Sequence, residues 1–94
     1  MSESQITITW TDYMRYRAKA RGFDLTQIEH IVRYSSERYR DTVTGRLIAV
    51  GRIDDLLVII PCDAEQSSIT PVTIHAVSRQ QINFRLKTGR FVNE

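Results

Sequence analysis

The chain has 94 residues, of which 41% are hydrophobic and 26% charged, and its formal net charge at pH 7 is +2. This length and composition predict one soluble globular domain over residues 1–94 and exclude a disordered chain. No apolar run approaches the roughly 20 residues that a membrane-spanning helix needs, and the opening MSESQITITW lacks the charged flank and apolar block of a signal peptide. The single cysteine, Cys62, excludes an internal disulfide and favours the reducing cytoplasm.

The basic residues are almost all arginines, since Lys19 and Lys87 are the only lysines. The arginine side chain ends in a planar fork that matches phosphate and carboxylate groups. Basic residues gather near both ends of the chain, and acidic residues lie mostly between them. A basic face results if the fold places the two ends side by side.

The first elements are a short strand and a helix. Alternating apolar and hydroxyl residues over Ile6–Trp10 predict the strand. Thr11 or Asp12 is expected to cap a helix that runs to about Arg21 and ends at Gly22. Basic residues recur along this helix at a spacing of four, as Arg15 with Lys19 and Arg17 with Arg21. Like charges at this spacing repel, which predicts compensation by an anionic ligand or by Glu29 or Asp24 of the next element.

A second helix is predicted up to about Tyr34, capped by Asp24 or Thr26. Its expected buried stripe consists of Leu25, Ile28, Ile31 and Val32. His30 lies off this stripe, so we expect it to face solvent.

Four strands are predicted to follow, at Arg38–Val43, Arg46–Arg52, Leu56–Pro61 and Thr70–Val77. Thr44-Gly45 should form the turn between the first two. The third strand is apolar throughout, so it should be central, and Cys62–Ser68 is expected to be a polar loop.

The last predicted helix covers Ser78–Thr88, with Ser78 and Gln81 placed as a capping box. The element order β-α-α-β-β-β-β-α predicts an α+β fold, in which helices pack on one antiparallel sheet. Phe91–Glu94 should be mobile unless Phe91 docks.

The junction between the last predicted strand and the last helix carries the most suggestive chemistry. It brings the imidazole of His75 close in sequence to Ser78 and Arg79. A helix start of this kind is either an anion site or simply a strand followed by a capped amphipathic helix, and the sequence leaves both open.

Several other chemistries have little support. His30, His75 and Cys62 lack paired metal-ligand spacing, so neither a metal nor a cofactor is expected. The chain contains no nucleotide-binding glycine-rich loop, and Cys62 has no evident base beside it. Metal-free cleavage of RNA fits better, because RNA carries its own nucleophile, the 2′-hydroxyl. Such an enzyme needs cations that hold the phosphate and a group that transfers protons near neutral pH, and histidine suits the second task.

The order of motifs resembles the BrnT-type toxins and related small domains of the RelE/ParE superfamily. The matching segments cover nearly the whole chain and are ITW, Lys19-Ala20-Arg21-Gly22, DLTQIEHIV, DTVTGR, AVG and IHAVSR. The resemblance implies the RelE/ParE-like fold and a type II toxin: a metal-independent endoribonuclease that binds RNA and is neutralised by a cognate antitoxin protein. One departure is Ala20-Arg21-Gly22, because BrnT-type chains commonly have Lys-His-Gly at this point.

The resemblance also implies roles for six residues. Lys19, Arg46 and Arg79 would bind phosphate, Arg21 would add to RNA binding, and Arg85 would stabilise the transition state. His75 stands where the family more often has a small residue, so it is either an added acid/base or incidental.

Two further alternatives stay open at this point. The absence of a histidine after Lys19 favours a non-catalytic domain that binds nucleic acid or another protein. Five aromatic residues are sufficient either to line a homodimer interface or, as we expect for most of them, to fill the core. They are Tyr13, Tyr16, Tyr34, Tyr39 and Phe91.

Overall fold

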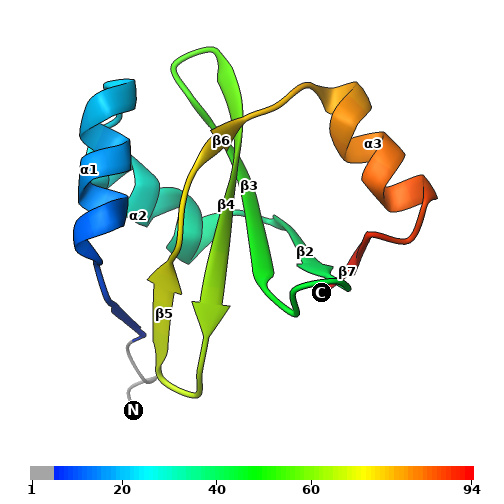
Figure 1. The fold of residues 1–94 in the computed structure, drawn as a ribbon, viewed down its shortest axis with the longest axis horizontal. Helices are drawn as coiled ribbons and strands as arrows, with labels where there is room; N and C mark the ends of the chain where they lie inside the picture. The colour runs from blue at the N-terminus through cyan, green and yellow to red at the C-terminus, as the bar shows by residue number, and fades with distance from the viewer. Residues whose placement is uncertain (1–5) are drawn as a thin grey trace.

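The computed structural model describes residues 6–94, which form an α+β fold with a mixed sheet and three helices. In Figure 1 the helices α1 and α2 lie on one side of the sheet and α3 lies on the other. The elements in chain order are β1 (Thr7–Ile8), α1 (Asp12–Arg21), α2 (Leu25–Tyr34), β2 (Glu37–Asp41), β3 (Leu47–Ile53), β4 (Leu56–Ala64), β5 (Ser68–Pro71), β6 (His75–Ala76), α3 (Arg79–Lys87) and β7 (Phe91–Asn93).

The strands are ordered β1-β5-β4-β3-β2-β7, and β6 pairs with β4 off this path. β1 and β5 run parallel, whereas the other strand pairs of residues 6–94 are antiparallel. The prediction of a purely antiparallel sheet is therefore wrong at this edge. Parallel neighbours need a long crossover, and α1, α2 and the β2–β4 meander supply it between β1 and β5.

The prediction that a polar loop begins at Cys62 and runs to Ser68 is also wrong at its start, because β4 continues through Pro61 to Ala64. Cys62 is fully buried on the same face of the sheet as Val58 and Ile60. The carbonyl and the nitrogen of Pro61 face Val72, at the point where β4 changes neighbour from β6 to β5. Proline is tolerated in this central strand because no ladder hydrogen bond is required from its nitrogen there.

The single predicted strand Thr70–Val77 is divided into β5 and β6. β5 ends at Pro71, and the chain rejoins β4 only where His75 pairs with Ile59. Proline cannot donate to a ladder, which favours the end of β5 at this residue. The break lets Ile74 turn into the core, fully buried, while His75 points to the other side.

The C-terminus is ordered by the docking of Phe91, which is 2% exposed. Phe91–Asn93 form β7, an edge strand paired with β2 in the register Asp41↔Phe91. The Phe91 ring also stacks on Tyr39 at a centroid distance of 5.8 Å. The predicted order lacked this C-terminal strand. With the division of Thr70–Val77 it counted five strands where residues 6–94 contain seven.

The sheet separates two apolar clusters. One contains Met14, Ala18 and Ile28 from the first two helices, packed against β3 and β4. The other lies under α3 and contains Ile82 and Phe91 with alternate residues of the same strands. Both faces of β3 and β4 are therefore covered, as their apolar sequences predict.

The helix boundaries follow their capping residues as predicted. Thr11 Oγ1 accepts a hydrogen bond from the Met14 amide, and Asp24 caps α2 in the same manner. Ser78 and Gln81 form the predicted capping box at α3. Gly22 ends α1 with φ 76°, a left-handed conformation that glycine adopts without strain. No helix within residues 6–94 is long and apolar enough to cross a membrane.

The aromatic residues divide differently from the prediction. Tyr13, Tyr16 and Tyr34 are 54%, 68% and 70% exposed, so they do not fill the core. The core position of Phe91 is confirmed, and Tyr39 is partly buried against the same cluster. The three exposed tyrosines lie on α1 and α2, whose apolar stripes are already filled by aliphatic residues.

Candidate functional site

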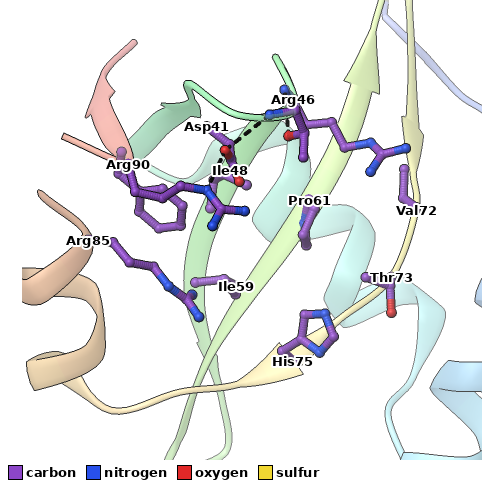
Figure 2. Close-up of a pocket in the computed structure, with 12 residues that line it drawn as sticks. Asp41, Arg46, Ile48, Ile59, Pro61, Val72, Thr73, His75, Arg85 and Arg90 are labelled. Atoms are coloured by element: carbon purple, nitrogen blue, oxygen red, sulfur yellow. Dashed lines mark hydrogen bonds and ion pairs between the residues drawn. The ribbon is translucent and has the colours of Figure 1, made fainter. Parts of the chain in front are cut away.

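A cleft of about 230 Å³ opens on the α3 side of the sheet, between β4, β6 and the chain ahead of β7 (Figure 2). Its polar lining is dominated by four groups that are or can become cationic. They are Arg46, His75, Arg85 and Arg90. Apolar residues of β3 and β4, such as Ile48 and Ile59, form its floor. Such a concave site with convergent charged groups is suited to an anionic ligand.

The three arginines of the cleft differ in how far their charge is compensated. Arg46 Nε lies 3.0 Å from Asp63 Oδ1, and Arg90 Nε lies 2.7 Å from Asp41 Oδ1. Arg85 has no carboxylate within ion-pair distance in the part of the chain that the structure describes, and its guanidinium lies over the Phe91 ring at 5.5 Å. Arg85 is therefore the cation of the cleft with the most positive charge left for a ligand.

Asp41 fixes the upper edge of the cleft. Asp41 is 5% exposed, and its carboxylate accepts hydrogen bonds from the amides of Val43 and Thr44, which closes the turn before β3. The hydrogen bond from Arg90 holds the pKa of Asp41 below its usual value. Arg90 is thereby anchored at Nε, while the rest of its guanidinium points into the cleft.

His75 forms the opposite edge and links the cleft to α1. Arg17 Nη2 lies 3.2 Å from His75 Nδ1. An arginine can only donate, so Nδ1 accepts, and in the neutral ring the proton is on Nε2. Burial lowers the pKa of His75, and the positive charges of Arg17, Arg21 and Arg85 lower it further. The imidazole is therefore neutral near pH 7, and a negative charge placed beside it would raise its pKa.

Thr73 adds an unusual polar group to the same cleft. Its Oγ1 is buried and has no hydrogen-bond partner, and within residues 6–94 it is the only buried side-chain nitrogen or oxygen in that state. Buried hydroxyl groups in folded proteins nearly always have a partner. A ligand or a water molecule at this position would supply the missing hydrogen bond.

Three of the six residues singled out by sequence meet in this cleft, namely Arg46, His75 and Arg85. Arg79 does not join them, because its guanidinium is bound by Glu37, with Nη2 3.1 Å from Oε1. That contact is the main reason why the pKa of Glu37 lies below its usual value. Lys19 and Arg21 project from α1 and do not line the cleft, although the charge of Arg21 acts on His75.

The expected compensation of the α1 cations by Glu29 or Asp24 does not occur. Glu29 pairs with Arg33 within α2, at 2.8 Å, and Asp24 caps that helix. Of the residues described, no carboxylate pairs with Arg15, Arg17, Lys19 or Arg21. The mutual repulsion of these charges is therefore left to solvent or to a ligand.

Two residues of the site were not singled out by sequence. The sequence marks Arg17 only as one of several cations of the first helix, and its spacing of four from Arg21 indicates that both face the same way. Arg90 is 49 positions from Asp41, so no local pattern could reveal their contact. Both depend on long-range packing of α1 on β6 and of β7 on β2.

Other chemical groups lie outside this cleft. Burial raises the pKa of the Cys62 thiol to about 12, so it is not a reactive nucleophile. Over residues 6–94, no three His, Cys, Asp or Glu side chains gather in a way that could hold a metal ion. His30 is exposed on α2 beside Tyr34, as expected.

Comparison of the chain with protein-family models, curated proteins and solved structures finds no match in any of the three sets. The chemistry of the cleft therefore has to be inferred from its own residues.

Proposed function

We propose that the protein is a metal-independent endoribonuclease, similar to the toxin of a type II toxin–antitoxin pair with a RelE/ParE-like fold. The supporting observation is the convergence of Arg46, His75 and Arg85 in one cleft, although they come from three separate segments of the chain. RNA is the substrate class whose cleavage needs arginines and a histidine together. Its own 2′-hydroxyl is the nucleophile, so the protein has only to neutralise charge and transfer protons.

In the proposed reaction the arginines of the cleft bind the phosphate. Arg85, with no carboxylate partner in residues 6–94, and Arg90, on the same side of the cleft, lie against the non-bridging oxygens. Arg46, which is bound to Asp63, adds positive charge from the other side. The 2′-oxygen attacks phosphorus, the bond from phosphorus to the 5′-oxygen breaks, and the arginines stabilise the extra negative charge of the phosphorane. The products are a 2′,3′-cyclic phosphate and a free 5′-hydroxyl.

His75 transfers the proton in this scheme. The bound phosphate draws the Arg17 guanidinium away from Nδ1, which exposes a basic nitrogen on a neutral ring. Nδ1 then takes the proton of the 2′-hydroxyl, and the imidazolium returns it to the leaving 5′-oxygen. The proton count balances, and no other reactant is required.

The test is incubation of the purified protein with mixed-sequence single-stranded RNA in EDTA. We expect fragments that end in 2′,3′-cyclic phosphate, and their loss in the variant His75→Ala at unchanged helix content. Addition of whole ribosomes in a parallel sample extends the test to an enzyme that acts only on translated RNA. Intact RNA in both samples contradicts the proposed catalysis.

One observation favours the second candidate function, a non-catalytic nucleic-acid-binding domain. The contact from Arg17 occupies Nδ1, the nitrogen of the neutral His75 ring that carries no proton. If Arg17 keeps this contact when RNA binds, the ring can donate from Nε2 but cannot accept the 2′-hydroxyl proton. This alternative predicts RNA binding that weakens steeply with salt and yields no product.

A further inference from the structure

A second, open hollow of about 620 Å³ lies beside the cleft, along the solvent side of α3. The two spaces share Arg85 and Arg90, which line both. The remaining lining of the hollow differs from that of the cleft, because it consists of amide, hydroxyl and aromatic groups. They include Gln80, Gln81, Phe84 and Thr88.

Phe84 is the unusual member of this lining. It is 66% exposed, although Ile82 two positions earlier is fully buried and Phe91 is 2% exposed. The core under α3 is complete without it, since Ile82, Leu86 and Phe91 close that cluster. A large aromatic face beside two arginines is the combination that single-stranded nucleic-acid sites use for base stacking.

The volume and the polar groups agree with a nucleotide as the occupant. The hollow lies within the range of about 300–1,000 Å³ that small-ligand sites occupy. Gln80 carries one carbonyl and one amide on an exposed side chain, so it can meet both donors and acceptors on a base edge. Gln81 is partly committed, because its Oε1 accepts the Ser78 amide at 2.8 Å in the capping box.

We propose that this hollow is a base-binding subsite, in which a nucleobase stacks on Phe84 while its adjoining phosphate lies between Arg85 and Arg90. The inference rests on the proposed function, because it takes the cleft to be the site of an RNA phosphate. It adds that the protein holds RNA as an unpaired single strand, since a base in a duplex cannot present its face to Phe84. The amide of Gln80 then reads the base edge.

The test compares four variants for binding of a fluorescently labelled, mixed-sequence single-stranded RNA whose 2′-hydroxyls are replaced by fluorine, so that it cannot be cleaved. The variants are Phe84→Ala, Phe84→Trp, Arg85→Ala and Tyr34→Ala. Tyr34 is the matched control, because it is 70% exposed and lies on α2, away from both spaces. Fluorescence anisotropy gives the Kd of each variant at several salt concentrations.

We expect Phe84→Ala to weaken binding about fivefold or more, as the loss of one stacked base does. Its salt dependence should stay that of the parent, because no phosphate contact is removed, and Phe84→Trp should restore affinity. An RNA without bases should bind the parent and Phe84→Ala equally. Tyr34→Ala should have no effect.

Two results overturn the inference, and they can be told apart. If Phe84→Ala binds like the parent while Arg85→Ala binds weakly, the base subsite is wrong and the phosphate cleft stands. If Arg85→Ala also binds like the parent, the phosphate cleft and the base subsite are both wrong. Equal thermal unfolding of all four variants shows that folding is not the cause.

Discussion

At the scale of single residues, His75 combines the features that the proposed chemistry needs. It lies at the edge of the cleft and accepts a hydrogen bond from Arg17. Burial, and after it the charges of three arginines, lower its pKa below the ordinary histidine value. A bound phosphate would offset these positive charges, and its own negative charge would raise the pKa of the ring.

The lowered pKa of His75 predicts a pH-dependent stability. The unfolded chain has a histidine pKa of about 6.5, so below that pH it binds a proton that the folded protein does not accept until its own lower pKa is reached. The contribution of His75 to the free energy of unfolding should therefore be fully present above pH 6.5. It should be lost as the pH drops from 6.5 through the folded-state pKa. Urea unfolding at steps between pH 8 and 5.5 measures this.

The control for this prediction is His75→Gln, which keeps a polar side chain but does not titrate. Its unfolding free energy should change less over the same pH steps than that of the parent. Glu37 and Asp41 also have lowered pKa values, but their contribution is lost only as the pH falls below about 4.5 and 3.8. An equal pH dependence in His75→Gln and the parent would show that His75 is not the group responsible.

At the scale of elements, α2 packs on β3 at a position that only glycine fits. A Cβ atom on Gly51 would lie 2.7–2.9 Å from three side-chain atoms of Ile31. Real Cβ contacts are longer than this, so α2 or the Ile31 side chain would have to move. We expect Gly51→Ala to lower the free energy of unfolding by about 1–3 kcal/mol.

Removal of the obstructing side chain should reverse part of this effect. The double variant Gly51→Ala/Ile31→Ala should lose less unfolding free energy than the two single variants lose together, because the new methyl group fills the space that Ile31 leaves. Denaturant unfolding of the parent, both single variants and the double variant measures the coupling. Strict additivity would mean that the two residues do not touch.

Two phenylalanines near the C-terminus give a matched pair for the packing of β7 and α3. Phe91→Ala removes a ring that is 2% exposed and should cost about 3–5 kcal/mol, as for other buried aromatic residues. Phe84→Ala changes a ring that is 66% exposed and should stay within about 0.5 kcal/mol of the parent. Thermal unfolding compares them directly, and similar losses in both would contradict the assignment of Phe91 to the core.

Local patterns predicted the elements whose signals are local. The caps at Thr11, Asp24 and Ser78 and the glycine stop at Gly22 lie where the sequence places them. The apolar face of α2 and the central position of β4 also follow from periodicity. These signals depend on residues within about one turn or one strand, so no tertiary information is needed.

The differences arise where distant partners decide. Pro61 was expected to end its strand, but it faces Val72, which lies between the registers of β5 and β6, so β4 continues there without a ladder bond from the proline nitrogen. The short segment at Phe91 becomes a strand because β2 offers it an edge. In the site, Arg79 and Arg85 look alike in sequence, and only the position of Glu37 separates the paired arginine from the one that faces the cleft.

At the scale of the whole molecule, the small net charge of +2 conceals a strongly uneven distribution. The acidic residues of the sheet pair with some arginines, as in Glu37 with Arg79 and Asp63 with Arg46. The cations of α1 meet the cleft through the contact of Arg17 with His75 at β6, near the edge of the sheet. Charges from both basic ends of the chain act on His75, through contact with Arg17 and through the charge of Arg85, although their helices lie on opposite sides of the sheet (Figure 1).

The central claim is that the cleft, and not the basic surface in general, holds the RNA phosphate. The most direct test is the salt dependence of RNA binding for the parent, Arg85→Ala and Arg79→Ala. These two variants lose the same charge from the same helix, but only Arg85 lines the cleft. Arg85→Ala should bind more weakly, and the slope of log K against log salt should fall by about 0.7, the value for one single-strand phosphate contact. Arg79→Ala should keep the parent slope. A slope that falls equally in both variants, or only in Arg79→Ala, would contradict the assignment.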